Sequence, residues 1–226
     1  MHRSLVISLT LFTIIQAPAA AQTCMALASF SAAPVQLTGS GSFSDLSTTF
    51  GATAGYGLPS SVYGNVGVSR TSIDAVDGSS LGLAARAGYQ LNLGGARPIQ
   101  ICPNASFELG MGPNDEVGGV ERSRRTATVG VNLGAEMVAG PRMKVVPSAG
   151  LSFAYGTQKA EDTAGSTLFE ISNSYALAQL GVGIILNQNI SVRPGIDIPL
   201  GLEGGNPMFG LTLGYNFGPA QTGRRQ

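Results

Sequence analysis

The titratable side chains of this sequence offer little material for catalysis. The only histidine, His2, lies at the start of an apolar N-terminal stretch. If that stretch is removed as an export signal, neither a Ser/His/Asp triad nor a histidine-containing metal site can be built from the rest of the chain. Glu108 could pair with a loop acid, but inward charges more often form structural networks. We therefore expect no catalytic residue, no cofactor and no enzyme.

Acidic side chains gather in three polar stretches, and their oxygens could hold Ca²⁺. Their spacing matches no known calcium loop, so solvated polar loops are the preferred interpretation and no metal site is predicted. These residues are Asp74, Asp77, Asp115, Glu116, Glu121, Glu161, Asp162 and Glu170.

Cys24 and Cys102 are the two cysteines of the chain. Export would place them in an oxidising compartment, so a disulfide between them is predicted. Because sequence does not fix the distance between the two side chains, two free thiols remain the alternative. Lipidation of Cys24 is a weaker alternative, because Gln22 and Thr23 form a poor approach to a lipidated cysteine.

The N-terminus has the three parts of a cleavable export signal. His2 and Arg3 form a short charged region, an apolar run follows at 5–15, and Ala19, Ala20 and Ala21 form a small-residue cleavage site. The apolar run is well short of the roughly 20 residues that a spanning helix needs. We expect cleavage before Gln22 and a mature chain in the bacterial outer membrane.

The composition argues against nucleic acid as a partner. The formal net charge is +0 at pH 7, and no run of Lys or Arg exceeds a pair. The sequence therefore contains no basic cluster that would bind a phosphate backbone. With 12% charged residues, 43% hydrophobic residues and 32 glycines, the chain is also too apolar for a disordered one.

Beyond the signal, apolar and polar residues alternate with the period of two that is typical of strands. The longer segments match or exceed the 9–11 residues that cross a bilayer at a tilt. The alternation predicts ten strands, at 35–43, 49–58, 61–70, 80–92, 99–111, 126–137, 143–156, 175–186, 190–200 and 208–217. Eight strands are the alternative, because the first hairpin alternates most weakly.

The connections alternate in length. Short turns are expected at 58–61, 93–97, 139–141 and 187–189, and longer polar loops at 71–79, 112–123, 157–173 and 201–207. Short periplasmic turns, long outer loops and an even number of strands are typical of outer-membrane barrels. The predicted fold is all-β, a closed up-and-down antiparallel transmembrane barrel. The expected division is a signal peptide at 1–21, a periplasmic N-terminal segment at 22–34, the barrel at 35–217 and a short periplasmic tail at 218–226.

The two faces of the expected strands differ in charge. The apolar face carries no charge between Val62 and Phe217, which favours a lipid-facing exterior around a polar lumen. Glu136 and Lys144 should meet across a hairpin, and Arg193 and Asp197 lie four apart on one face. The six inward charges are Arg86, Glu108, Glu136, Lys144, Arg193 and Asp197, which balance and suggest internal pairing in a narrow lumen.

Aromatic residues fall near both ends of the apolar face, as in the girdles at the two membrane interfaces. The group near the long loops is Phe43, Phe50, Phe107, Phe153, Tyr155 and Phe209, and the group near the short turns is Tyr56, Tyr89, Tyr215 and Phe217.

With this pattern the chain resembles the small bacterial outer-membrane β-barrel family that includes the OmpX and OmpA-type barrels. The closing strand at 209–217 is similar to the aromatic-ended signal that the family's assembly machinery reads, although residues 218–226 follow it here. The resemblance implies a lipid bilayer and the assembly machinery as partners, and we expect a monomer. The expected function is a structural or adhesion-type surface role, with a surface ligand at the long loops; a narrow channel for small solutes or ions is the alternative.

Overall fold

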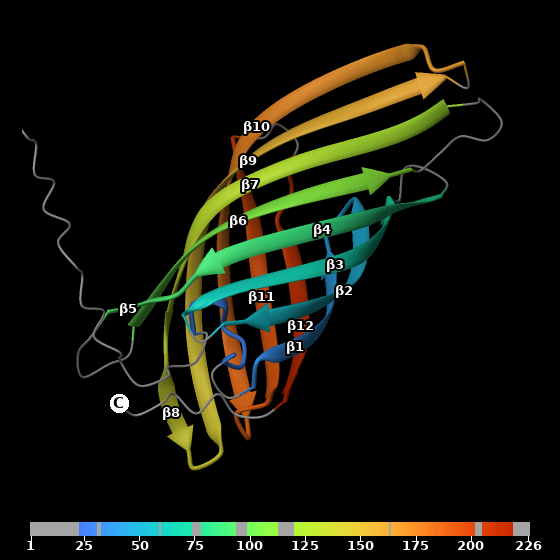
Figure 1. Cartoon of the computed structure of the whole chain (residues 1–226). Coiled ribbons are helices and arrows are strands. Elements are labelled where there is room, and N and C mark those ends of the chain that lie inside the picture. Colours follow the sequence, from blue (N-terminus) through green and yellow to red (C-terminus); the bar gives the residue numbers. More distant parts are fainter. Residues whose placement is uncertain are drawn as a thin grey trace, which may run out of the picture.

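Antiparallel strands make up almost all of the described chain (Figure 1). The computed structural model describes residues 23–30, 33–58, 60–73, 78–93, 99–112, 120–162, 164–201 and 205–218. The expected signal peptide, the tail beyond Gly218 and four of the loop acids (Asp74, Asp77, Asp115 and Glu116) lie outside these residues. Within the described ranges, no helix is long and apolar enough to cross a membrane.

The elements follow one another with short connections. In chain order they are η1 (Thr23–Met25), β1 (Val35–Phe43), β2 (Ser47–Gly57), β3 (Val62–Ile73), β4 (Ser79–Tyr89), β5 (Leu91–Leu93), β6 (Ile99–Met111), β7 (Val120–Ala135), β8 (Met137–Gly140), β9 (Met143–Asp162), β10 (Thr167–Leu186), β11 (Ile190–Leu200) and β12 (Met208–Phe217).

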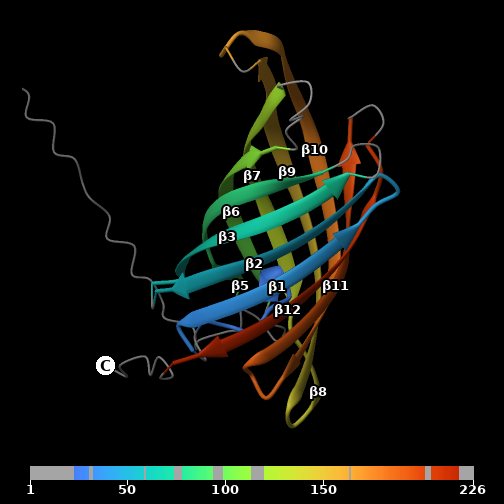
Figure 2. The same ribbon diagram turned by 90° about the vertical axis from the view of Figure 1, so that its right-hand side faces the viewer.

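The first and last strands close the sheet into a barrel (Figure 2). β1 pairs with β12 from Val35 opposite Phe217 to Phe43 opposite Phe209. β4 and β5 both pair with β6, and β7 and β8 both pair with β9, so each of these couples is one barrel strand with a short interruption. The predicted closed barrel of ten strands is confirmed, and the alternative of eight is excluded.

Three strands extend six or more residues beyond their predicted bounds, and β3 continues three residues further than predicted, to Ile73. The loop expected at 157–173 is wrong, because β9 continues to Asp162 and β10 begins at Thr167. The loop expected at 112–123 is also too long, because β7 begins at Val120. Polar residues on both faces hid these extensions, since a strand beyond the bilayer has no need of an apolar face. Cross-strand pairs continue there, with the hydroxyl groups of Thr157 and Ser172 3.0 Å apart.

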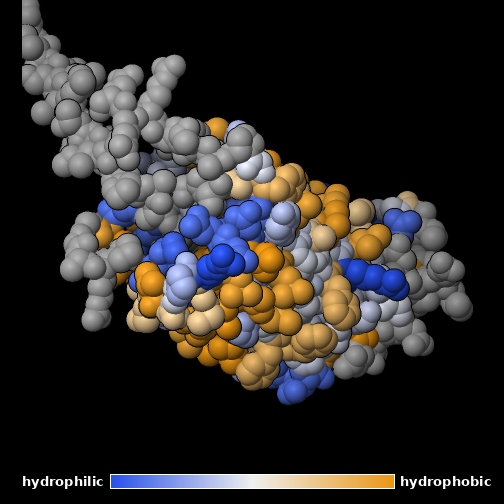
Figure 3. Space-filling view, turned by 90° about the horizontal axis from the view of Figure 1, so that it is seen from below, coloured by the Kyte–Doolittle hydropathy of each residue, from blue (hydrophilic) through white to orange (hydrophobic). Residues whose placement is uncertain are grey.

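The outside of the barrel is apolar, and hydrophobic residues cover a large part of the wall seen in Figure 3. Side chains such as Val66 and Leu213 are 62% and 53% exposed to the surroundings of the isolated chain. A largely apolar exterior suits lipid, and a closed barrel leaves no unpaired backbone edge there. The expectation of an uncharged outer face is wrong at Arg70, which lies near the end of β3 and donates a 2.9 Å hydrogen bond to Ser79.

Candidate functional site in the lumen

The N-terminal segment lies inside one end of the barrel, where it forms a plug, defined here as residues 23–30 and 33–34. Its side chains from Cys24 to Phe30, apart from Met25, are between 0% and 6% exposed. The short helix η1 lies inside the barrel, behind β1 and β2 in Figure 2, and contacts β6, β7 and β9. The periplasmic segment expected at 22–34 is therefore, over its described residues, packed into the lumen at the end that carries the short turns.

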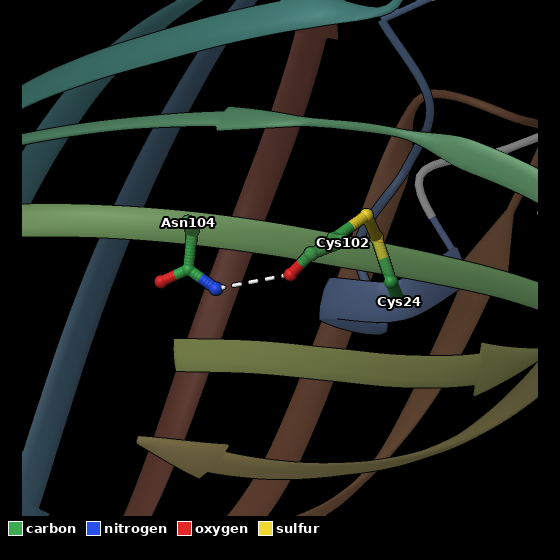
Figure 4. The surroundings of a disulfide bond; sticks show 3 residues. All are labelled: Cys24, Cys102 and Asn104. Carbon is green, nitrogen blue, oxygen red and sulfur yellow. Dashed lines mark hydrogen bonds between the residues drawn. A yellow bond between two sulfur atoms is a disulfide. The ribbon is translucent and has the colours of Figure 1, made fainter. Parts of the chain in front are cut away.

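A disulfide anchors the plug to the wall, as predicted. Cys24 on η1 is bonded to Cys102 on β6, with a Cα–Cα distance of 5.9 Å (Figure 4). The backbone carbonyl of Cys102 accepts a 3.1 Å hydrogen bond from the Asn104 amide. The bond spans a sequence separation of 78. On loop-entropy grounds such a cross-link stabilises the folded state by about 4 kcal/mol.

Two buried amide side chains hold the backbone of the plug. Gln36 on β1 donates a 3.0 Å hydrogen bond to the carbonyl of Ala28. Asn216 on β12 donates to the carbonyls of Ser29 at 2.9 Å and Ala28 at 3.3 Å. These bonds satisfy carbonyls that would otherwise be buried without donors.

Apolar contacts complete the packing of the plug. Phe30 stacks on Tyr63 of β3 with ring centroids 6.2 Å apart. Ala26 and Ala28 pack with Val146 of β9 and Ile185 of β10, and all four side chains are almost fully buried.

Two glycines make room for the plug. A Cβ atom at Gly57 would overlap Phe30, and one at Gly183 would overlap the carbonyl of Ala26. The inward-facing Val146 and Ile185 interrupt the polar pattern of the lumen, and this interruption was the available sequence signal for a plug.

The predicted inward charges do not all pair as expected. Lys144 and Glu136 form an ion pair of 2.6 Å across the β8–β9 hairpin. Glu108 pairs with Arg124, a residue that we had placed at the margin of a loop. Arg124 is two residues before Thr126, which faces the lumen, so the alternation of the strand could have placed the Arg124 side chain in the lumen as well.

The remaining three charges form no ion pair with one another within 4.0 Å in the described chain. Asp197 accepts a 3.1 Å hydrogen bond from Gln179. Arg193 lies with its guanidinium against Gly181. Arg86 on β4 and Arg193 on β11 lie on opposite walls of the barrel.

The predicted girdle residues lie on the outside of the barrel. Nine of the ten are 39–62% exposed, and Tyr89 is half-buried. Phe43 and Phe50 meet edge to face at 5.9 Å, and Tyr215 and Phe217 stack at 6.2 Å.

A three-stranded sheet projects from the barrel end opposite the plug (Figure 1). β10 pairs with β11 only as far as Ala176 opposite Leu200, but it pairs with β9 as far as Thr167 opposite Glu161. The segment of β10 between Thr167 and Tyr175 therefore has one edge with no partner among the described strands.

These features define a class of protein: a closed transmembrane β-barrel of the outer-membrane type, with a plug inside it. No family model and no curated protein matches the sequence. Among solved structures, the transport unit of the autotransporter AIDA-I from Escherichia coli is similar at 12% identity and a TM-score of 0.47, covering 81% of this chain and 89% of that one. The translocator domain of NalP from Neisseria meningitidis is similar at 10% identity and a TM-score of 0.46, covering 82% of this chain and 88% of that one. The attachment invasion locus protein Ail of Yersinia pestis is similar at 11% identity and a TM-score of 0.42, covering 82% of this chain and 99% of that one.

Proposed function

We propose that this chain is a non-enzymatic outer-membrane barrel that uses its projecting sheet to bind a partner at the cell surface. The observation that carries the proposal is the free edge of β10 from Thr167 to Tyr175. Such an edge offers a row of backbone N–H and C=O groups to which an extended polypeptide can add as a further strand.

Side chains of this edge supply apolar contact area. Phe169 and Ile171 are 44% and 51% exposed, and they lie on the same face of β10 because they are two residues apart. Glu170 lies on the other face of β10, where it is paired with Lys159 of β9. An extended partner would gain main-chain hydrogen bonds from the edge and apolar contacts from one face of the sheet.

The proposal assigns no catalytic role to the chain. After the expected cleavage before Gln22, the mature sequence has no histidine. Glu108, the inward acid considered for carboxylate chemistry, is held by the guanidinium of Arg124. A paired carboxylate of this kind supports the wall of the lumen more readily than it supports proton transfer.

The same proposal covers location and assembly. We infer export through a cleaved signal peptide, insertion by the barrel-assembly machinery through the closing strand β12, and a monomer in the bilayer. The aromatic girdles would lie at the two membrane interfaces.

The test is to shorten the projecting hairpin and to measure attachment. Residues 160–169 are replaced by Asn-Gly, which joins the paired positions Lys159 and Glu170 by a tight turn. Cells that make the wild-type protein should attach to immobilised extracellular proteins, tested in native and unfolded form, and cells that make the shortened protein should lose this attachment.

Folding is checked by heat-modifiable migration in gels of outer-membrane fractions, which should be unchanged. Equal attachment of wild-type and shortened proteins, or wild-type attachment no greater than that of cells without the protein, would contradict the proposal.

A narrow channel is the second candidate, and the polar lumen beyond the plug favours it. The hydroxyl groups of Thr38 and Thr53 form a 2.7 Å hydrogen bond there. Asn104 and Asn132 also face the lumen. In this case the plug closes the path. Single-channel conductance in planar bilayers should stay at baseline for the wild-type protein and rise for Cys24→Ala/Cys102→Ala; a baseline signal from both would dispose of the channel.

A further inference from the structure

Two buried hydrogen-bond donors without acceptors, and one half-buried arginine, lie on the barrel walls at the plug and just beyond it. The hydroxyl of Tyr63 and the Nε atom of Arg193 are buried, and neither has a hydrogen-bond partner among the described residues. Tyr63 as a whole is 2% exposed. No hydrogen bond or ion pair joins Arg86 to another residue in the described ranges. Buried donors without acceptors are costly, so the missing acceptors of the Tyr63 hydroxyl and the Arg193 Nε atom need an explanation.

Arg86 and Arg193 lie on opposite walls. Around the barrel, β4 and β11 are separated by β3, β2, β1 and β12 on one side and by the strands from β6 to β10 on the other. The inward-facing side chains of these two strands therefore point toward each other across the lumen.

Both arginines also lie just beyond positions that pack at the plug. On β4, the inward residue before Gly88 is Arg86, and Gly88 lies against the Tyr63 ring that stacks on Phe30 of the plug. On β11, the inward residue after the buried Ser191 is Arg193. Each arginine is thus one inward position beyond the level of the plug.

A second contact fixes the height of Arg193. Its guanidinium lies against Gly181, where an added Cβ atom would be 2.9 Å from Nε. Gly183, the next inward residue of the same strand, touches the carbonyl of Ala26 in the plug. The guanidinium therefore lies directly above the plug and not beside it.

The charges at this level do not balance. Arg86 lies on the wall opposite Arg193, and Gly88, the next inward residue of its strand, lies against the Tyr63 hydroxyl. The carboxylate that acts on Arg193 is Asp197, two inward positions further along β11 and hydrogen-bonded to Gln179. Asp197 is thus the one inward carboxylate of the described chain that forms no ion pair, since Glu108 pairs with Arg124 and Glu136 with Lys144.

We propose that the lumen above the plug is an oxyanion-binding site, formed by Arg86 and Arg193 with the Tyr63 hydroxyl as a third donor. The ligand class is a small solute with a phosphate, sulfate or carboxylate group. Guanidinium groups recognise such oxygens through paired, charge-assisted hydrogen bonds. The plug forms the floor of the site, and the solute enters from the opposite end of the barrel.

The test uses the refolded mature protein in detergent micelles, titrated with inorganic phosphate, sulfate or acetate at constant ionic strength, with chloride as the balancing anion. Calorimetric titration should show one saturable site, and the thermal unfolding midpoint should rise with the same half-saturation. Arg86→Gln and Arg193→Gln should each weaken binding by about tenfold or more, the loss expected for one charge-assisted hydrogen bond. Tyr63→Phe should weaken it less, because it removes one neutral donor.

Arg125→Gln is the matched control, since Arg125 is an exposed arginine of β7, opposite Leu109 of β6, on the outward face of the barrel. It should leave the titration unchanged. The proposal is overturned if the wild-type protein shows no saturable binding of any of the three anions, or if the lumen variants bind as tightly as the control. If an arginine variant fails to migrate as a folded barrel, the wild-type titration and Tyr63→Phe still decide the outcome.

Discussion

Gln36 donates a 2.8 Å hydrogen bond to Asn216 across the seam where the first and last barrel strands meet. Both amides also donate to the carbonyl of Ala28 in the plug. The closure of the barrel and the seating of the plug therefore share one buried polar network, and each stabilises the other.

The network predicts a large cost for Asn216→Ala. The change leaves the buried carbonyl of Ser29 without its Asn216 donor, takes one of two donors from that of Ala28 and removes the acceptor of Gln36, so we expect a loss of about 3 kcal/mol in the free energy of unfolding. Denaturant unfolding in micelles measures it. Asn132→Ala, in the lumen on β7, should cost less than half as much; equal costs would show that Asn216 does not act through the plug.

The disulfide should also be a main source of plug stability. Cys24→Ala/Cys102→Ala should lower the free energy of unfolding by about 2–5 kcal/mol, because the cross-link no longer restricts the unfolded chain. Hydrogen exchange at residues 26–30 should rise more than exchange in β11. Unchanged exchange at the plug would mean that its non-covalent contacts suffice to hold it.

Glycine positions test how tightly the plug fits. Gly183→Ala places a methyl group against the carbonyl of Ala26 and should destabilise the protein by about 1–3 kcal/mol through overpacking. Gly39→Ala is the control, because a Cβ there meets nothing within 4 Å. We expect it to be neutral or slightly stabilising, since alanine loses less backbone entropy than glycine on folding. A destabilisation of the same size in both variants would argue against the plug contact.

Two ion pairs of equal length should differ in strength. Lys144–Glu136 and Lys159–Glu161 both measure 2.6 Å, but the Glu136 side chain is 11% exposed and the Glu161 side chain 35%. Double-mutant cycles of unfolding should give a coupling of about 1 kcal/mol for the first pair and below about 0.5 kcal/mol for the second. Both couplings should fall with added salt, and the exposed pair should fall first. A larger coupling for Lys159–Glu161 would contradict the role assigned to burial.

Local patterning determined the barrel. A strand in lipid must turn one face outward at every second residue, so runs such as Ile99–Met111 and Ile190–Leu200 were predictable to the residue. The hairpin order then allowed Glu136 and Lys144 to be paired in advance. The disulfide followed from the number of cysteines and the expectation of export, without any knowledge of distance.

Tertiary structure alone decided the plug inside the barrel and the strands that project from its end. Residues 24–30 have no periodicity that predicts a partner, and their contacts reach residues as distant in sequence as Asn216, which comes close only when β12 closes on β1. The projecting strands were missed because polar residues in water obey no two-faced pattern, and cross-strand pairing alone keeps them extended. The cluster of Arg86, Arg193 and Tyr63 likewise exists only because closure brings opposite walls together above the plug.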